Sequence, residues 1–208
     1  MKISYAITVC NELKEVSHLL NFLHQHKRPE DEICVLLDKP KASQQLLDEL
    51  YYWSSKDIII LKESTFQGHF ADWKNELTAM CSGDYIFQID ADEYPHSYFI
   101  ESLPTILEHN SAVELYAVPR VNTVEGLTQE HIQKWGWRVD DNKWINWPDF
   151  QTRIYKNSPD IKWKNKVHER LDGHKEFAYL PMEEEWALYH PKSIDRQEKQ
   201  NNYYNTLQ

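Results

Sequence analysis

The stretch Tyr85-Ile86-Phe87-Gln88-Ile89-Asp90-Ala91-Asp92-Glu93 decides the fold of this chain. It begins as an apolar run with β-strand character and ends in two aspartates spaced i, i+2, with the breaker Pro95 just beyond. Because successive side chains of a strand point to opposite faces, this spacing returns Asp90 and Asp92 to the same side where the strand ends. Two carboxylates there suit a hard cation, Mg²⁺ or Mn²⁺, that keeps positions open for substrate phosphates.

The alternative interpretation of this aspartate pair is a solvated acidic turn, which is the commoner meaning of so short a motif. The Gly83-Asp84 turn and the apolar run before the pair favour a buried central strand instead. In an open α/β sheet, ligands bind at the carboxyl ends of such strands. The sequence therefore predicts a cation and ligand site at residues 90–93.

Strands and helices alternate four times before residue 95. Strands are predicted at residues 3–10, 33–37, 58–61 and from 85 onward, and helices with an apolar stripe at residues 13–23, 46–51 and 70–80, with Asn11 as the N-cap of the first. This alternation predicts an α/β fold with three layers around a mostly parallel central sheet.

The second half of the chain follows a different pattern. We expect a helix from Ser97 or Pro104 to Glu108, short strands at 113–118, 151–155 and 186–189, and a closing helix from Ser193. Residues 121–148 have no sustained period, and structureless segments of this length are uncommon unless they serve a function. At 208 residues and without a recognisable linker, the chain is predicted to be a single domain, with a nucleotide-binding half (1–95) and an acceptor-side half with the closing helix (96–208).

Composition excludes several classes of protein. With 23 basic and 33 acidic residues the net charge is −10, which argues against a nucleic-acid partner but leaves room for a local basic pocket for a diphosphate. The three cysteines are odd in number and far apart, so a disulfide framework or a zinc cluster is not indicated. No segment approaches the roughly 18 apolar residues of a membrane span, and the N-terminal apolar run is too short for a signal peptide. We expect a soluble, cytoplasmic protein.

Several motifs in the first half, taken in order and spacing, resemble the family-two glycosyltransferases with a GT-A fold. They are Thr8-Val9-Cys10-Asn11-Glu12, Asp38, Phe70-Ala71-Asp72-Trp73-Lys74-Asn75 and Ile89-Asp90-Ala91-Asp92-Glu93. Later pieces resemble the bacterial lipopolysaccharide-core type of that family: Arg153–Asn157, Trp163 with Lys166-Val167-His168-Glu169, and Tyr189-His190-Pro191. The similarity extends from residue 4 to about 204. The sequence departs from the pattern at Lys39-Pro40, where many members carry a more acidic turn, and this affects nucleoside recognition.

The resemblance implies a role for nine residues. It implies a nucleotide-sugar pocket, for a UDP-sugar as the expected donor, that is lined by Thr8, Asn11, Glu12, Asp38, Lys74, Asn75 and Asp90. It implies a Mn²⁺ or Mg²⁺ site made by Asp90, Asp92 and His190. Our choice for the catalytic base is Glu169, with Asp149 and Asp141 in reserve, because an acceptor hydroxyl must lose a proton as it attacks. An alternating strand through residues 166–169 would send Glu169 and His168 to opposite sides.

Structural interpretations compete with these roles. Asp38 could cap the following turn, Glu12 could be a first-turn helix acid, and Lys74 or Glu169 could be an ordinary surface charge. His190 could be a satisfied core histidine. Among the eight tryptophans, Trp163 and Trp186 are predicted to be core. Four others in the unpatterned segment are candidates for a sugar-facing wall: Trp135, Trp137, Trp144 and Trp147.

The sequence favours a metal-dependent inverting glycosyltransferase of the hexosyltransferase type, which moves a sugar from a nucleotide-diphosphate donor to a hydroxyl of a glycan or other acceptor. One alternative is a sugar- or nucleotide-binding module of the same fold without turnover. Another is a metal-dependent nucleotidyl transferase, which is disfavoured because the chain has no G-x-x-x-x-G-K-[ST] phosphate cradle.

Overall fold

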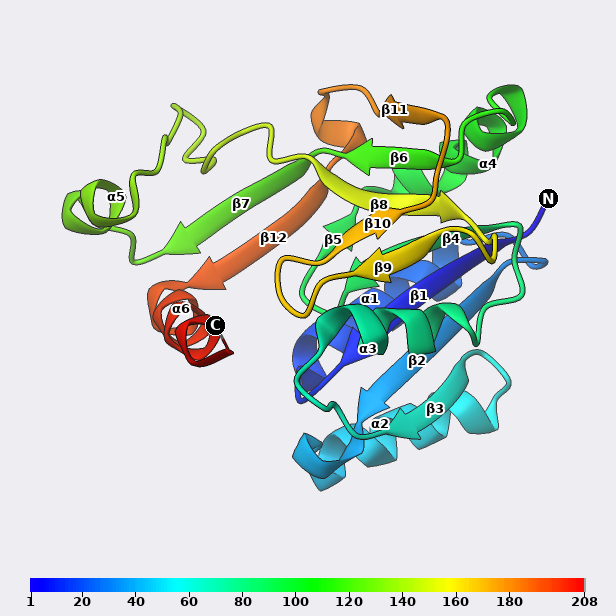
Figure 1. Ribbon diagram of the computed structural model, residues 1–208. Helices are drawn as coiled ribbons and strands as arrows, with labels where there is room; N and C mark the ends of the chain where they lie inside the picture. Colours follow the sequence, from blue (N-terminus) through cyan, green and yellow to red (C-terminus); the bar gives the residue numbers. More distant parts are fainter. Residues whose placement is uncertain (208) are drawn as a thin grey trace.

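A mostly parallel sheet forms the centre of the molecule (Figure 1). The structure is a computed structural model that describes residues 1–207, with side chains described through residue 202. Within these residues the sheet has seven strands in the order β11-β6-β8-β4-β1-β2-β3. Their bounds are β1 Ile3–Val9, β2 Glu32–Asp38, β3 Ile60–Ser64, β4 Tyr85–Asp90, β6 Leu115–Val118, β8 Gln151–Lys156 and β11 Phe177–Tyr179. Strand β8 runs antiparallel to its neighbours β4 and β6, and the other pairs are parallel.

Two hydrophobic layers cover the two faces of this sheet. On one face pack helices α1 (Leu13–His26), α2 (Gln44–Ser55) and α4 (Ser97–His109). On the other pack α3 (Phe70–Thr78) and the hairpin of β9 (Lys162–Lys164) and β10 (Arg170–Asp172). Alternate residues of one strand supply both layers, since Ile7 of β1 belongs to the first and Ala6 to the second. The predicted three-layer α/β class with a mostly parallel sheet is confirmed.

A smaller sheet extends away from the central one toward α5 and α6 (Figure 1). It contains β5 (Tyr94–Pro95), β12 (Leu188–Ser193) and β7 (Arg120–Glu125), with β12 in the middle. Helix α5 spans Gln129–Trp135, and the predicted closing helix is present as α6 (Ile194–Leu207). Two 3₁₀ turns, η1 (Lys39–Lys41) and η2 (Glu184–Trp186), complete the elements. Strand β12, near the C-terminus, pairs with β5 from the first half of the chain and with β7 from the second. This sheet therefore joins both halves of the sequence.

Three details differ from the sequence prediction. Strand β7 and helix α5 lie in the segment where the sequence predicted no regular element. Strand β7 was missed because it is only half-buried and its sequence shows no apolar alternation. Trp186 is buried as predicted, but it lies in η2 and not in a strand. Asn11 does not cap α1: its Oδ1 accepts a hydrogen bond from the backbone N–H of Ser43, and the helix begins after Glu12.

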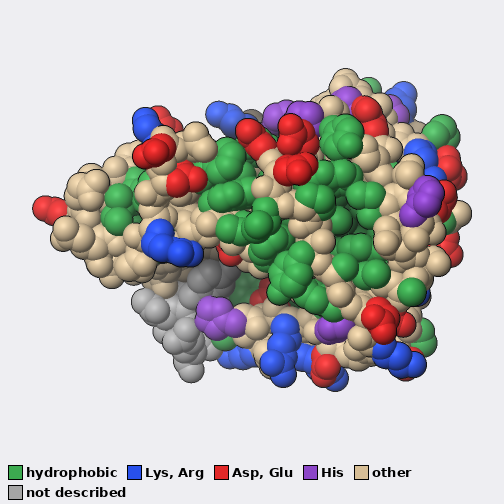
Figure 2. All heavy atoms as spheres, turned by 90° about the horizontal axis from the view of Figure 1, so that it is seen from above, with side chains coloured by type: hydrophobic (Ala, Val, Ile, Leu, Met, Phe, Trp, Pro, Cys, Tyr) green, Lys and Arg blue, Asp and Glu red, His purple; other side chains and the backbone are tan. Residues whose placement is uncertain are grey.

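One face of the molecule carries a broad group of hydrophobic side chains bordered by acidic ones (Figure 2). Strand β11 forms the sheet edge on this side, and its Tyr179 and the nearby Met182 are more than 60% exposed. Aromatic rings pack on one another here, with Phe150 and Phe177 each within 5 Å of the Tyr179 ring. Among the described helices, none has the length and apolar character needed to cross a bilayer.

At the opposite end of the strands, Glu32 joins the amino ends of β1 and β2 and the turn before β4. Its carboxylate accepts hydrogen bonds from Lys2 Nζ at 2.5 Å, Ser4 Oγ at 2.6 Å and the backbone N–H of Ser82 at 2.6 Å. Burial alone would raise the pKa of Glu32, but these hydrogen bonds lower it from its ordinary value to about 2. A carboxyl group with a depressed pKa stabilises the fold above the pKa of the unfolded chain and loses this effect as the pH falls through the folded value.

We predict that Glu32→Gln destabilises the protein at pH 7 and that the difference from the wild type shrinks as the pH falls from about 4.5 to about 2. Urea unfolding at several pH values measures this difference. The matched control is Glu30→Gln, because Glu30 is exposed and its pair with Arg28 is 3.3 Å long, so its removal should change the free energy of unfolding little. An equal difference between Glu32→Gln and the wild type at pH 7 and pH 2.5 would contradict the assignment.

Candidate active site

A cavity of about 800 Å³ opens at the carboxyl ends of the central strands. Thr8 of β1 and Asp90 of β4 are register partners at this edge, and Asp38 ends the neighbouring β2. Eight of the ten predicted site residues line the cavity: Thr8, Glu12, Asp38, Lys74, Asp90, Asp92, Glu169 and His190. They come together because parallel strands place their carboxyl ends at one edge of a sheet.

Asp90 is held by two partners from the sheet itself. Arg153 of β8 donates to its Oδ2 at 2.6 Å, and Gln88 donates to its Oδ1 at 2.9 Å. Burial alone would raise the pKa of Asp90, but Arg153 and then Lys74 lower it well below its ordinary value. Asp90 is therefore a fixed anion whose two oxygens are already engaged by the protein.

Asp92 faces a different set of groups. Its Oδ2 lies 3.3 Å from Nε2 of His190 on β12 and 3.2 Å from Nη2 of Arg196 on α6. Burial acts against its charge, but the contact with His190 lowers the pKa of Asp92 below its ordinary value. The two aspartates thus lie on one side of the strand end, as their spacing predicts, and have different partners.

A fully buried carboxylate, that of Glu93, connects the groups beneath the cavity. Its Oε1 accepts from Arg153 at 2.6 Å and from Arg120 of β7 at 3.0 Å, and its Oε2 accepts from the backbone N–H of Asp90 at 3.1 Å. Arg120 in turn donates twice to Asp149, through Nε at 3.0 Å and Nη2 at 2.6 Å. Arg120 and hydrogen bonds overcome the effect of burial and lower the pKa of Asp149.

The network returns to the cavity through two further hydrogen bonds. Asn122 Nδ2 donates to Asp149 at 2.8 Å, and Asn122 Oδ1 lies 2.8 Å from His190 Nδ1. Because His190 also contacts Asp92, a continuous chain of hydrogen bonds leaves the β4 end at Asp90 and comes back to it at Asp92. Asp149, one of the two reserve candidates for the base, is a member of this chain.

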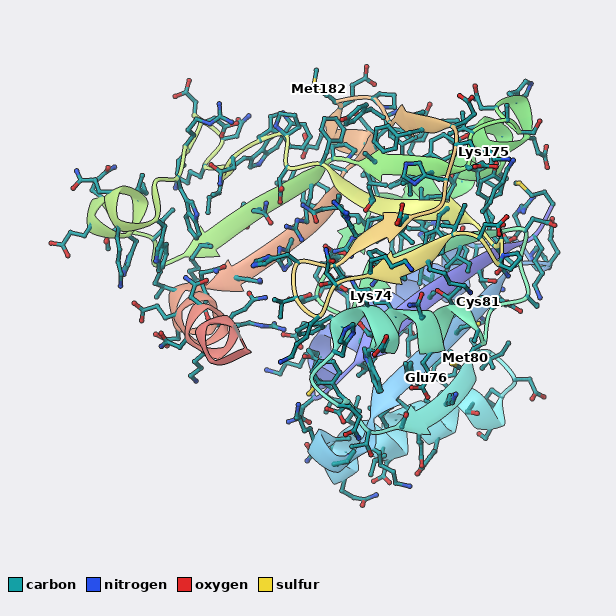
Figure 3. The ribbon with its side chains drawn as sticks, in the orientation of Figure 1. Lys74, Glu76, Met80, Cys81, Lys175 and Met182 are labelled. Carbon is teal, nitrogen blue, oxygen red and sulfur yellow. The ribbon has the colours of Figure 1, made fainter. Side chains whose placement is uncertain are left out.

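Glu169 lies in the loop between β9 and β10 and pairs with Lys74 of α3, at 2.6 Å between Oε1 and Nζ. The Lys74 ammonium lies 4.4 Å from the centre of the Trp163 ring, a cation–π contact. In Figure 3, Lys74 is on the side of α3 that faces this loop. The expected alternating strand through residues 166–169 is wrong: these residues form a turn, and His168 has a φ of 53°. The other reserve candidate, Asp141, is exposed and does not line the cavity.

Asn11 and Asn75 lie outside the cavity lining. Asn75 uses both ends of its amide on the backbone of Trp163, at 2.9 Å each, and so joins α3 to β9. Asp38 does line the cavity, and it also accepts from the backbone N–H of Phe66 at 3.1 Å, which holds the loop after β3. Glu12 accepts from the backbone N–H groups of Cys10 and Asn11 at 2.8 and 2.9 Å. Asp38 makes no side-chain capping hydrogen bond to the following turn, and Glu12 precedes the first turn of α1, so neither makes the structural contact expected from the sequence. Both side chains line the cavity.

The tryptophans divide differently from the prediction. Trp137 lines the cavity, and its ring packs 4.6 Å from that of Trp135. Trp144 packs on Trp147 at 4.9 Å, and neither lines the cavity. Trp163 is buried, as expected of a core residue, yet it also lines the cavity beside Lys74. One loop tryptophan and one core tryptophan are therefore positioned to contact a ligand.

A divalent cation fits part of the predicted metal set. Asp92 and His190 offer a carboxylate oxygen and an imidazole nitrogen to the cavity, and both suit Mn²⁺. Among residues 1–207, no three His, Cys, Asp or Glu side chains are grouped so that they could hold one ion together. Asp90 is not grouped with Asp92 and His190 in this way, and its two oxygens accept from Arg153 and Gln88. Two protein ligands leave most positions of a metal to water and phosphate oxygens, as is usual for Mg²⁺ at phosphate-binding sites.

Cations gather at the α6 side of the cavity in a chain whose net charge is −10. Lys192, Arg196 and Lys199 line it, and Lys192 donates to Gln200. Burial lowers the pKa of Lys192 from its ordinary value. A local basic wall of this kind suits a ligand that carries phosphate groups.

The sequence matches the model of glycosyl transferase family 2 over residues 4–174, and the chain belongs to this family. Its fold is similar to that of TarS from S. aureus. The 1–349 fragment in complex with UDP superposes with a TM-score of 0.65 at 16% identity, and the fragment with UDP-GlcNAc with a TM-score of 0.64 at 18% identity. Both alignments cover 92% of this chain but only about 60% of the fragment. The full TarS structure aligns over 37% of its length, with a TM-score of 0.63. No curated protein sequence matches the chain.

Family membership confirms the predicted glycosyltransferase at the level of the family, and the TarS structures confirm the fold. Sequence reasoning missed Arg120 and Asn122 altogether, and it quoted Glu93 and Arg153 in motifs without giving them a role in the site. The sequence marks them weakly, because Arg153, Arg120 and Asn122 lie in strands of mixed polar and apolar residues. Only the general rule that a buried charge requires a partner applies to them.

We predict that Arg153→Met lowers the free energy of unfolding by about 3–5 kcal/mol, because it leaves the buried carboxylate of Glu93 and that of Asp90 without their shared cation. Denaturant unfolding measures this loss. Arg138→Met is the matched control, since Arg138 is exposed in the loop after α5. A loss below about 1 kcal/mol, the usual value for a surface pair, would show that Arg153 does not bind the network together.

Proposed function

We propose that the protein is a metal-dependent inverting glycosyltransferase that moves a sugar from a nucleotide-diphosphate donor to a hydroxyl of a glycan or other acceptor. The observation that carries this proposal is one cavity lined both by the Asp92–His190 pair and by Glu169. The first can hold a cation beside a leaving diphosphate, and the second can take a proton from an acceptor. Family membership supports the reaction class.

A UDP-sugar is the donor that we infer. In support, TarS structures of similar fold contain UDP and UDP-GlcNAc, and the cavity of this chain lies at the carboxyl ends of β1, β2 and β4. Asp38 and Thr8 lie there beside Asp90, where a nucleoside would contact the strand ends. Asp90, already fixed by Arg153, would orient the ribose and not bind the metal.

A Mn²⁺ or Mg²⁺ ion held by Asp92 and His190 would act as a Lewis acid on the charge of the leaving diphosphate. Lys192 and Arg196 line the same cavity and would supply further positive charge toward a bound diphosphate. Arg196 now pairs with Asp92 at 3.2 Å and with Glu15 at 2.9 Å, so it must exchange part of these contacts when the site is loaded.

Glu169 is the proposed general base. It accepts the proton of the acceptor hydroxyl while that oxygen forms a bond to the anomeric carbon and the bond to the diphosphate oxygen breaks. A single displacement of this kind inverts the anomeric configuration. Lys74 pairs with Oε1 of the Glu169 carboxylate and orients it. The ammonium of Lys74 also makes a cation–π contact with the Trp163 ring. Trp137 offers an apolar face for the acceptor sugar.

The similarity of the sequence to the lipopolysaccharide-core type points to a saccharide acceptor of that kind, and cytoplasmic location also stays a prediction. An assay of donor consumption tests the reaction class. Release of UDP from UDP-sugars in the presence of Mn²⁺ and a sugar acceptor supports transfer. Release of pyrophosphate would indicate nucleotidyl transfer, and binding without release would indicate a module without turnover.

We predict that Asp92→Asn abolishes the Mn²⁺-dependent increase in melting temperature that UDP gives to the wild type, because a ligand that binds only the folded state stabilises it by mass action. The variant should keep the melting temperature of the unliganded wild type within a few degrees. Asp195→Asn, a nearby exposed aspartate of α6, is the control and should respond to UDP and Mn²⁺ as the wild type does. An unchanged response of Asp92→Asn would exclude Asp92 as a ligand.

We predict that Glu169→Gln lowers turnover by about 10²–10⁴-fold and leaves UDP binding unchanged, because general-base catalysis contributes to the chemical step and not to donor affinity. Steady-state kinetics and a thermal shift with UDP separate the two effects. Glu176→Gln changes an exposed glutamate in the same half of the chain and serves as the control. Turnover within a few-fold of the wild type would contradict the role of Glu169.

A further inference from the structure

Asn122 lies between the buried charge network and the proposed metal site. It is on β7, directly beside His190 of β12, since the two residues are register partners in this parallel pair. Its Nδ2 donates to Asp149 Oδ2 at 2.8 Å, and its Oδ1 lies 2.8 Å from His190 Nδ1. His190 is 8% exposed, so its ring contacts protein on most sides.

The orientation of the Asn122 amide follows from its neighbours. Asp149 Oδ2 already accepts two hydrogen bonds from Arg120, which marks it as an ionised, accepting oxygen. Only the NH₂ end of an amide can donate to such an oxygen. The amide must therefore present its carbonyl oxygen to His190, because the reverse orientation would place two acceptors against each other at 2.8 Å.

This carbonyl oxygen determines which nitrogen of His190 carries a proton. An amide oxygen only accepts hydrogen bonds, so Nδ1 of the ring must donate to it. In a neutral imidazole with a proton on Nδ1, the other nitrogen has an exposed lone pair. In this neutral form Nε2 of His190 presents its lone pair to Asp92 Oδ2 at 3.3 Å, so either a proton or a metal ion must lie between the two atoms for the contact to be attractive. Arg196 Nη2 lies 3.2 Å from the same oxygen of Asp92.

We infer that Asn122 is a positioning residue for the metal site: held by Asp149 and Arg120, it fixes His190 in the Nδ1-protonated form so that Nε2 is free to bind a divalent cation together with Asp92. This inference rests on the proposed metal-dependent function. Such outer partners of metal-binding histidines typically change metal affinity by 10–100-fold when they are removed. The same geometry explains why a polar asparagine lies in a half-buried strand position.

The first test observes the ring without any metal. Protein labelled with ¹⁵N in histidine and treated with EDTA is studied by long-range ¹H–¹⁵N NMR, at a pH where the ring shifts show neutral imidazole. A His190→Gln variant assigns the signal among the ten histidines. We expect the proton on Nδ1 in the wild type and a shift of population to the Nε2-protonated form in Asn122→Leu. A wild-type His190 with its proton on Nε2 would overturn the inference.

The second test measures Mn²⁺ affinity directly, by electron paramagnetic resonance of the free ion. Asn122→Leu should weaken binding by about 10–100-fold. Asn21→Leu makes the same change on the exposed face of α1 and should bind Mn²⁺ as the wild type does.

The two tests separate the inference from the function on which it rests. If Asn122→Leu keeps both the wild-type tautomer and the wild-type affinity, Asn122 does not position His190. If the wild type itself binds no Mn²⁺, the metal part of the proposed function fails, and the tautomer comparison still supports or overturns the role of Asn122. Melting temperatures report whether each variant is folded, and Asn122→Ala replaces Asn122→Leu if the larger side chain unfolds the protein.

Discussion

The carboxylate of Glu93 is fully buried between two arginines, and the arrangement of the site depends on this contact. An isolated charge in such a position would be costly, so Arg153 and Arg120 must remain beside it. Arg153 belongs to the central sheet and Arg120 to the smaller one. The requirement to neutralise one carboxylate therefore holds the two sheets together at the end of β4, next to Asp90 and Asp92.

Two separate series of ion pairs and hydrogen bonds connect Glu93 to Asp90 and to Asp92. Arg153 leads directly to Asp90, and Arg120 leads through Asp149, Asn122 and His190 to Asp92. Every charged member has a partner of opposite sign, which lets the network be rigid, and within the described residues Arg153 Nε is a buried donor of this network without a hydrogen-bond partner. A rigid arrangement of charges is what stabilises a developing diphosphate at low cost in reorganisation.

The predictable part of this site is the part that local sequence encodes. An apolar run that ends in Asp90-Ala91-Asp92 specifies a buried strand with two carboxylates at its exit, and the alternation of strands and helices specifies that parallel strands share that edge. The network beneath it joins residues 27 to 98 positions apart, and no periodicity reports such contacts. Asn75 is a residue for which a motif match misled the prediction. Its neighbour Lys74 lines the cavity, but the side chain of Asn75, one residue further along α3, bonds to β9.

Glu169 illustrates a different relation between sequence and site. The prediction of a strand at residues 166–169 was wrong because the chain turns there between two three-residue strands, with Asn165 and His168 both at positive φ. The carboxylate still reaches the cavity, since the backbone N–H of Phe70 donates to Lys166 and Lys74 pairs with Glu169, so that both ends of the turn are held by α3. The cavity thus combines a rigid half on strands with a loop that carries Glu169, the proposed base. Acceptors vary more in shape than diphosphates do, and a loop held at a few points can change its sequence without disturbing the strands.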